Sequence, residues 1–263
     1  MYSHIKEKDG TPGSASHFPS PSGKSEGGSG LCVIAHIESD FPTKFGVPRQ
    51  SGLVSGLTSR IIFTPEYRNA DALRGLDGFS HIWLLWDFSQ AHDGKPWRPT
   101  VRPPRLGGNQ RMGVWATRSP FRPNHIGLSC VRILSIELHT PQGPVITVEG
   151  ADLMSGTPIL DIKPYLPYVD AHPEARGGFA QEQNERLKPL TVEIPAPLES
   201  LIPQDKRDSL RAILASDPRP HYQDDPERTY VLPFSTLEIS FQVSEGHLHV
   251  TSVKPAPAVP TAP

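Results

Sequence analysis

Apolar residues in the first two thirds of the chain occur in short runs that are rich in β-branched and aromatic side chains and are separated by glycine and proline. Runs of this kind are typical of β-strands. The predicted strands are Leu31–Ile37, Ser59–Phe63, Ser80–Phe88, Arg111–Ala116, Gly127–His139 and Val145–Gly150. Only Asn69–Leu76 has the pattern of a short helix, which we expect to end near Gly78. Six or more strands with one short helix predict a barrel or a sandwich and not a doubly wound sheet.

A second pattern follows a segment, Pro164 to Ala180, in which proline and glycine recur and which we interpret as a domain boundary. Pro203 is expected to open a helix, and Asp217-Pro218 to end it. The apolar face of that helix is predicted to carry Leu210, Ile213 and Leu214. From Leu237 onwards apolar and polar residues alternate, with a turn at Ser244-Glu245-Gly246, which predicts a β-hairpin. This part of the chain is therefore expected to form a small α+β domain.

The two ends of the chain have compositions that do not favour a packed core. Residues 9–30 are rich in Gly, Ser and Pro, and Lys254–Pro263 is rich in Pro and Ala. We expect a disordered leader at 1–30, a strand-rich domain at 31–170, a small domain at 171–253 and a Pro-rich tail at 254–263.

Composition narrows the class of protein. The 263 residues are 36% hydrophobic, which is enough for a core. No apolar run approaches the length of a membrane span, and the N-terminus lacks the apolar segment of a secretion signal, so we expect a cytoplasmic protein. Two widely separated cysteines do not support a disulfide framework or a zinc site. The glycine-rich phosphate-binding motifs, the HExxH and CxxC metal and redox motifs and the GxSxG hydrolase motif are all absent.

Charge is distributed unevenly. Residues 94–136 contain eight basic residues, seven of them Arg, and no Asp or Glu, although the whole chain has a formal charge of −2. Arginine pairs with phosphates and carboxylates through two parallel hydrogen bonds and stacks on flat rings. The basic block therefore predicts an anionic partner such as a nucleotide or a polynucleotide on one face, although solvated loops would also accommodate several of these arginines.

Three polar segments with many Pro and Gly residues are hard to explain as core. They are residues 44–50, the pair 98–108 with 116–124, and the pair 152–158 with 161–168. Prolines beside arginines restrict the loop backbone and so pre-organise the guanidinium groups. Together the segments predict one binding face that is built from several loops at strand ends.

These segments also carry a resemblance to a known family. The runs VPRQSGL, LRGLDGFSHIW, RPTVRPPRLGG, MGVWATRSPFRPN, DLMSGTPILDIKPYLP and DPRPHY occur in order between about Ile34 and Tyr222. The chain is similar in these runs to the TsaA/TrmO family of S-adenosylmethionine-dependent tRNA methyltransferases. It departs from the family pattern at His125, where the usual run has proline.

The resemblance implies a fold, a reaction and an assembly. It implies a single-sheet, seven-stranded antiparallel β-barrel with a small C-terminal α+β domain, acting as a homodimer. It implies methyl transfer from S-adenosyl-L-methionine to N6 of threonylcarbamoyladenosine at position 37, in the anticodon loop of threonine tRNA. No metal and no membrane is implied.

The resemblance implies the cofactor contacts, whereas the other roles follow from the chemistry and position of the residues. The cofactor is expected to contact Pro48, Arg49, Gln50, His81, Ile82, Arg118, Leu128, Asp152, Leu153, Met154 and Ser155. The tRNA and its modified base are expected to contact Arg102, Arg105, Arg122, Asn124 and Arg219. For handling the proton of the acceptor nitrogen the candidates are Asp161, Lys163 and Tyr165, for which roles in turns are equally compatible with the sequence.

Two other functions fit the same residues. A non-catalytic RNA-binding module on the same barrel would use the arginines and the aromatic residues but would bind no cofactor. A methyltransferase acting on a small molecule would keep the cofactor pocket, although it would not need the second domain.

Overall fold

The computed structural model describes residues 30–91, 97–103, 110–181, 188–219 and 225–257. The predicted leader, apart from Gly30, and the tail beyond Pro257 lie outside the described residues. Val33–Pro263 form one compact unit. Within the described ranges no helix is long and apolar enough to cross a membrane.

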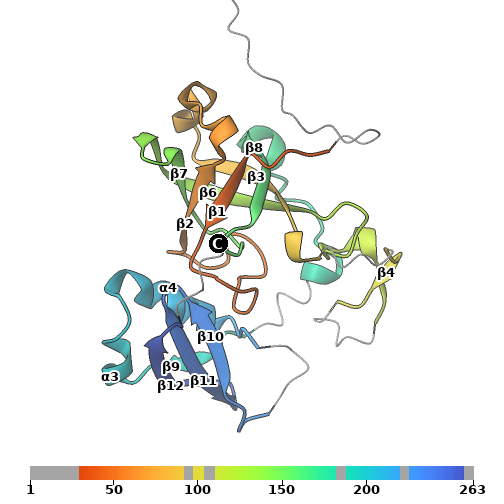
Figure 1. Cartoon of the computed structure of the whole chain (residues 1–263). Coiled ribbons are helices and arrows are strands. Elements are labelled where there is room, and N and C mark those ends of the chain that lie inside the picture. Colours follow the sequence, from red (N-terminus) through yellow and green to blue (C-terminus); the bar gives the residue numbers. More distant parts are fainter. Residues whose placement is uncertain (1–29, 92–96, 104–109, 182–187, 220–224, 258–263) are drawn as a thin grey trace, which may run out of the picture. The chain divides into compact units, whose positions relative to one another are not determined.

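Six antiparallel strands close into a barrel (Figure 1). They are β1 (Ala35–Glu38), β2 (Thr58–Phe63), β3 (His81–Asp87), β6 (Ile126–Thr140), β7 (Gly143–Glu149) and β8 (Pro158–Pro164). Their order around the barrel is β1-β2-β7-β6-β3-β8. In strand β3, Ile82, Leu84 and Trp86 alternate with more exposed positions and point into the barrel core, so the strand has one buried face. Each fully buried aliphatic side chain of this kind contributes about 1.5–3 kcal/mol.

The barrel has six strands in the described residues where seven were expected. The predicted strand Arg111–Ala116 forms only the two-residue strand β5 (Met112–Gly113), followed by the 3-10 turn η6 (Val114–Ala116). Strand β5 pairs with β4 (Thr100–Val101) in a separate two-stranded sheet. Within 111–116 only Val114 is buried, so the run has no alternating apolar face to offer to the barrel core.

The helix predicted at Asn69–Leu76 is likewise replaced by 3-10 turns. These are η1 (Pro65–Tyr67), η2 (Ala70–Leu73) and η3 (Leu76–Gly78), with η4 (Ser89–Ala91) after β3. Asn69 caps η2 by accepting a hydrogen bond from the backbone of Asp71. Gly75 has φ 85°, a left-handed conformation that ends the turn before a regular helix can form.

The C-terminal part contains a four-stranded sheet in the order β10-β11-β12-β9 (Figure 1). Its strands are β9 (Thr191–Glu193), β10 (Tyr230–Phe234), β11 (Leu237–Ser244) and β12 (His247–Pro255), and its helices are α3 (Ala196–Glu199) and α4 (Gln204–Ala215). A further short helix, α1 (Pro167–Asp170), follows β8. The predicted hairpin is β11–β12, whose turn residues Glu245 and Gly246 both have positive φ, as a type I′ turn requires.

The hydrophobic residues form two clusters. One fills the barrel, and the other joins α4 and the C-terminal sheet to Phe41, Val54 and Leu57 from the segment between β1 and β2. A polar contact joins the same two segments, because the ammonium group of Lys206 in α4 lies 2.6 Å from the carboxylate of Asp40 in the β1–β2 connection. The β1–β2 connection therefore packs with residues of the expected second domain, so the packing does not divide simply at residue 170.

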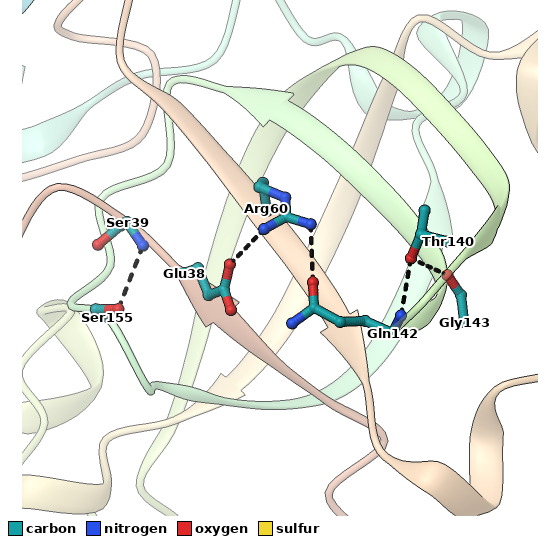
Figure 2. A network of polar contacts seen from close by, with 7 residues as sticks. All are labelled: Glu38, Ser39, Arg60, Thr140, Gln142, Gly143 and Ser155. Carbon is teal, nitrogen blue, oxygen red and sulfur yellow. Dashed lines mark hydrogen bonds and ion pairs between the residues drawn. The ribbon is translucent and has the colours of Figure 1, made fainter. Parts of the chain in front are cut away.

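A polar network on the barrel ties three elements together (Figure 2). The guanidinium group of Arg60 donates to Glu38 at 2.8 Å and to the side-chain oxygen of Gln142 at 2.9 Å. Gln142 lies in the β6–β7 turn, where the hydroxyl of Thr140 also donates to the backbone oxygen of Gly143. This network fixes the β6–β7 turn beside strands β1 and β2.

Candidate functional site

A cavity of about 870 Å³ lies where β3 ends, β6 begins and the β7–β8 connection passes. This is within the range of pockets that hold a small molecule or cofactor. Its lining comes from five separate segments, namely residues 44–50, 86–91, 115–122, 124–128 and 152–157. Parts of segments 44–50, 116–124 and 152–158 therefore meet at one cavity, whereas no described residue of 98–108 and no residue of 161–168 lines it.

One wall of the cavity carries positive charge. Arg49 and Arg118 both line it, and the guanidinium group of Arg118 hydrogen-bonds to the side-chain oxygen of Gln50. Arg49 also donates to the backbone oxygen of Asp217 at 3.3 Å, a contact that reaches the C-terminal part of the chain. Gln50 therefore holds Arg118 at the cavity wall, where a guanidinium group can receive a carboxylate in a two-point contact.

Asp152 stands at the end of a hydrogen-bonded chain that starts in the barrel core. The indole N–H of Trp86 donates to the hydroxyl of Ser129 at 3.0 Å, and this hydroxyl donates to the carboxylate of Asp152 at 2.5 Å. Burial raises the pKa of Asp152, while the hydrogen bond from Ser129 and the charge of Arg118 oppose the rise. The carboxylate is thus oriented and short of solvation, which favours binding of a cation or of a hydroxyl donor.

Glycine at position 127 lets the wall approach Trp86 closely. A Cβ atom built on Gly127 would overlap the indole ring of Trp86, so only glycine fits there without displacing the ring. The neighbouring Leu128 lines the cavity and is 47% exposed, and Met154 lines it as well. Leu128 and Met154 supply apolar surface that suits a flat ring such as adenine.

The rim of the cavity is aromatic and basic. Trp115, Phe121 and Arg122 all line it, and the guanidinium carbon of Arg122 lies 5.6 Å from the ring centre of Trp115. Arg122 also donates to the backbone oxygens of Thr117 and Ser119, at 3.0 and 3.4 Å. Its side chain is therefore fixed by the chain's own carbonyl groups.

Many of the residues expected at the site line this cavity. They are Pro48, Arg49, Gln50, Arg118, Arg122, Asn124, Leu128, Asp152, Leu153 and Met154. The expected residues that do not line it are His81, Ile82, Ser155, Arg102, Arg219, Asp161, Lys163 and Tyr165. Arg105 lies outside the described residues.

The geometry of β3 and β8 explains why His81, Lys163 and Tyr165 are absent from the lining. Asp161 pairs with Leu85, nearer the cavity end, but does not line the cavity. The two strands are antiparallel, and the cavity lies at the end where Trp86 pairs with Ile159. At the opposite end the backbone N–H of Tyr165 donates to the oxygen of His81. At about 3.3 Å per residue, Lys163 lies on the order of 20 Å along the strand from Thr157 in the cavity wall. Lys163 also forms an ion pair with Asp161 at 3.0 Å.

Other expected residues are engaged elsewhere. Ile82 is fully buried in the barrel core, and the side chain of Ser155 accepts a hydrogen bond from the backbone of Ser39. Arg219 donates to both carboxylate oxygens of Asp217, each at 2.9 Å, and its side chain is only 12% exposed. Arg102 is exposed and follows β4.

Sequence reasoning missed Trp86, Phe88, Trp115 and Ser129. Trp86 ends the run Ile82–Trp86, which is apolar throughout, so only the folded strand shows that Trp86 points inward. Ser129 gave no signal, since its role depends on the β3–β6 register, in which Leu84 faces Ser129. Among the described residues no group of three or more His, Cys, Asp or Glu side chains is placed to hold a metal ion.

Known proteins are similar to this chain over both its N-terminal and its C-terminal part. The family model of the tRNA-methyltransferase O N-terminal domain matches residues 36–171, and that of the TrmO C-terminal domain matches residues 179–256. The tRNA (adenine(37)-N6)-methyltransferase of Escherichia coli (strain K12) is 41% identical over 228 residues, which are 84% of this chain and 96% of that protein. A Pseudomonas aeruginosa protein described as a candidate S-adenosylmethionine-dependent methyltransferase is 40% identical over 219 residues, which are 78% of this chain and 89% of that protein. The crystal structure of TrmO from Pseudomonas aeruginosa superposes with a TM-score of 0.68 at 31% identity, covering 86% of this chain and 99% of that one.

Proposed function

The chain belongs to the TrmO family of tRNA methyltransferases, and on this basis we propose that it methylates N6 of adenosine 37 in tRNA. We propose further that the methyl donor is S-adenosyl-L-methionine, that the adenosine carries a threonylcarbamoyl group, and that the substrates are threonine tRNAs. The enzyme would act in the cytoplasm, where its substrate is found, and as a homodimer.

The single observation that carries the proposal is the composition of the cavity wall. A ligand that is both an amino acid and a nucleoside needs a cation for its carboxylate, an acceptor for its ammonium or ribose hydroxyls, and apolar surface for its adenine. The cavity supplies these as Arg118, Asp152 and the pair Leu128 and Met154. Its volume of about 870 Å³ also leaves room for part of an acceptor.

The chain's own contribution to the reaction is alignment in a partly desolvated site. S-adenosylmethionine, when bound, supplies an electrophilic methyl group on its sulfonium. In-line displacement requires the acceptor nitrogen to be held behind that methyl group, and correct alignment alone can supply several kcal/mol, up to about 7–11 kcal/mol in well-oriented intramolecular reactions. Arg122, held by the carbonyl groups of Thr117 and Ser119 at the rim, is placed to pair with the carboxylate of a threonylcarbamoyl group.

The proton on the acceptor nitrogen is a separate requirement. Asp161, Lys163 and Tyr165 are candidates for that step because they follow the third polar segment closely, but none of them lines the cavity. The carboxylates in the described lining are Asp87 and Asp152. We therefore assign the catalytic effect of the described residues to positioning and to the orientation of charge.

Reconstitution with purified protein tests the proposal. Methyl-labelled S-adenosylmethionine is supplied with threonine tRNA that either carries or lacks the threonylcarbamoyl group, and label transfer to position 37 is measured. We expect transfer to the modified tRNA only, and loss of transfer in Arg118→Ala. The matched control is Arg74→Ala, which removes an 81% exposed arginine that lies outside residues 94–136, is absent from the cavity lining and is expected to keep activity.

Each outcome separates the proposal from its rivals. Binding of tRNA without binding of the cofactor would favour the non-catalytic module. Cofactor binding with label transferred only to small molecules would favour the other methyltransferase class. Equal transfer to modified and unmodified tRNA would show that the threonylcarbamoyl group is not required, and the proposed methylation of adenosine 37 would still stand.

A further inference from the structure

Two tryptophan rings lie exposed beside the cavity rim. Trp97 is 49% exposed and Trp115 is 65% exposed, and their ring centres are 5.7 Å apart with planes inclined by 31°. The other two tryptophans are partly or fully buried, and their N–H groups donate to Asp170 and to Ser129. These two neighbouring, tilted rings therefore leave aromatic surface open to a ligand beside the cavity rim.

The local backbone holds this pair of rings, which we call the tryptophan platform (Trp97 and Trp115), in place. Strands β4 and β5 pair Thr100 with Gly113 and Val101 with Met112. The backbone N–H of Val114 donates to the oxygen of Pro99 at 2.9 Å, next to the paired residues. These bonds bring the backbone at residues 97 and 115 together, so both rings of the platform come from one β-ribbon.

The surroundings of the platform are cationic. Arg98, Arg102 and Arg111 are exposed on the same two-stranded ribbon and its flanks, and residues 94–136 contain no acidic side chain. The guanidinium group of Arg122 lies over Trp115. Aromatic rings among arginines are the combination that binds single-stranded nucleic acid, because the rings stack on bases and the arginines pair with phosphates.

The platform is continuous with the proposed site. Trp115 and Arg122 line the cavity, whereas Trp97 does not, so the rings extend from the rim outward. A base that undergoes chemistry must leave the stack of its loop, and the base beside it then loses a stacking partner. We propose that the tryptophan platform stacks the nucleobase adjacent to the acceptor adenosine in the anticodon loop, an inference that rests on the proposed function.

The test is a set of RNA-binding titrations with the full-length protein and a labelled anticodon stem-loop of threonine tRNA. We expect Trp97→Ala to weaken binding about tenfold and Trp97→Phe to recover most of the loss, because phenylalanine also stacks. Cofactor affinity in Trp97→Ala is expected to stay at the wild-type value, since Trp97 is outside the cavity lining, and this also shows that the variant is folded. The matched control is Leu134→Ala, which removes a 44% exposed apolar side chain of β6 away from the cavity.

Two further arms identify the contact as stacking on one base. In the wild type, an abasic nucleotide next to position 37 should weaken binding by about the same factor as Trp97→Ala, and the two changes together should cost no more than either alone. The slope of log affinity against log salt should be unchanged in Trp97→Ala, because stacking releases no counterions.

The outcomes distinguish a failure of this inference from a failure of the proposed function. A wild-type protein that methylates tRNA, combined with a Trp97→Ala variant that binds the stem-loop as tightly, overturns the platform and leaves the function standing. Fully additive losses for Trp97→Ala and the abasic nucleotide overturn the stacking contact. A wild-type protein that binds no stem-loop at all overturns both, and would point to a protein partner for the platform.

Discussion

At the scale of single residues, the site depends on the close packing of Gly127 against Trp86. Trp86 is the first donor of the chain that orients Asp152, so a shift of its ring is transmitted to the cavity wall. A glycine at this position is therefore a packing requirement that also serves binding.

Gly127→Ala is predicted to weaken both stability and cofactor binding. The added methyl group overlaps the indole ring of Trp86, and overpacking of this kind costs about 1–3 kcal/mol. Urea unfolding measures the first effect, and calorimetry with S-adenosylmethionine measures the second. Gly78→Ala is the control, because its new Cβ meets nothing within 4 Å. Wild-type affinity in Gly127→Ala would show that the orientation of Trp86 does not matter.

The carboxylate of Asp152 is expected to lower the free energy of unfolding at neutral pH and to strengthen cofactor binding. Because its pKa is raised above the ordinary 3.8, the folded chain keeps this proton to a higher pH than the unfolded chain does. The free energy of unfolding therefore falls as the pH rises through that interval, and the loss is complete above the raised pKa. Asp152→Asn should remove this pH dependence and be at least as stable at neutral pH.

The same variant should bind the cofactor poorly. Loss of a charged hydrogen bond costs about 1.5–3 kcal/mol, which corresponds to about 10- to 100-fold in affinity. Unfolding curves between about pH 3 and about pH 8 check the stability half, because this interval begins below the ordinary pKa of 3.8 and extends well above it. Calorimetry at neutral pH checks the binding half. A variant that loses stability at neutral pH while keeping its affinity would contradict the assignment.

At the scale of elements, the arrangement of strands was more predictable than the connections between them. A short apolar run predicted β3, and alternating apolar and polar residues predicted the β11–β12 hairpin, because a strand with one buried face carries a period of two. The predicted strand at Arg111–Ala116 was wrong over most of its length, since apolar composition alone does not say whether a run can present a buried face.

The residues of the candidate site also divide into those that the sequence predicted and those that depend on strand register. Loop residues such as Arg118 and Asp152 were expected from the family resemblance, they lie in Pro- and Gly-rich polar segments, and both line the cavity. His81 and Tyr165 lie far from the cavity because a strand carries its two ends to opposite ends of the barrel, and only the register shows which end is which. Ser129 and Trp86 depend on cross-strand contacts, which a single sequence does not contain.

The contact between Asp40 and Lys206 is expected to stabilise the joint core of α4 and the β1–β2 connection. Both side chains are largely buried, at 10% and 20% exposure, so removal of one leaves the other partly desolvated and unpaired. Lys206→Met should lower the free energy of unfolding by about 2 kcal/mol, and Asp40→Asn combined with it should recover part of the loss. Urea unfolding of the three variants forms the cycle; additive losses would show that the pair is not coupled.

At the scale of the whole molecule, charge separates the RNA-facing loops from the rest of the chain. The formal charge is −2, yet residues 94–136 contain only basic charged residues, so anionic RNA is attracted to one region and repelled elsewhere. This organisation favours correctly oriented encounters over general nucleic-acid binding.

Arg102→Ala is predicted to weaken tRNA binding without affecting the cofactor. Arg102 is exposed on the ribbon and does not line the cavity. Loss of one phosphate contact should reduce the slope of log affinity against log salt by about 0.7, the value for single-stranded nucleic acid. Titrations of tRNA at several salt concentrations measure the slope, and Arg118→Ala provides the contrast because it should abolish cofactor binding. Equal losses of both ligands in both variants would contradict this division of roles.

The most direct measurement is mass spectrometry of tRNA nucleosides from cells with and without the gene for this protein. Methylated threonylcarbamoyladenosine should be present in threonine tRNA when the gene is present and absent when it is deleted, with the unmethylated nucleoside increasing by the same amount. Reintroduction of the wild-type gene should restore the methylated nucleoside, and reintroduction of Arg118→Ala should not. An unchanged amount of methylated threonylcarbamoyladenosine after deletion would contradict the proposed function.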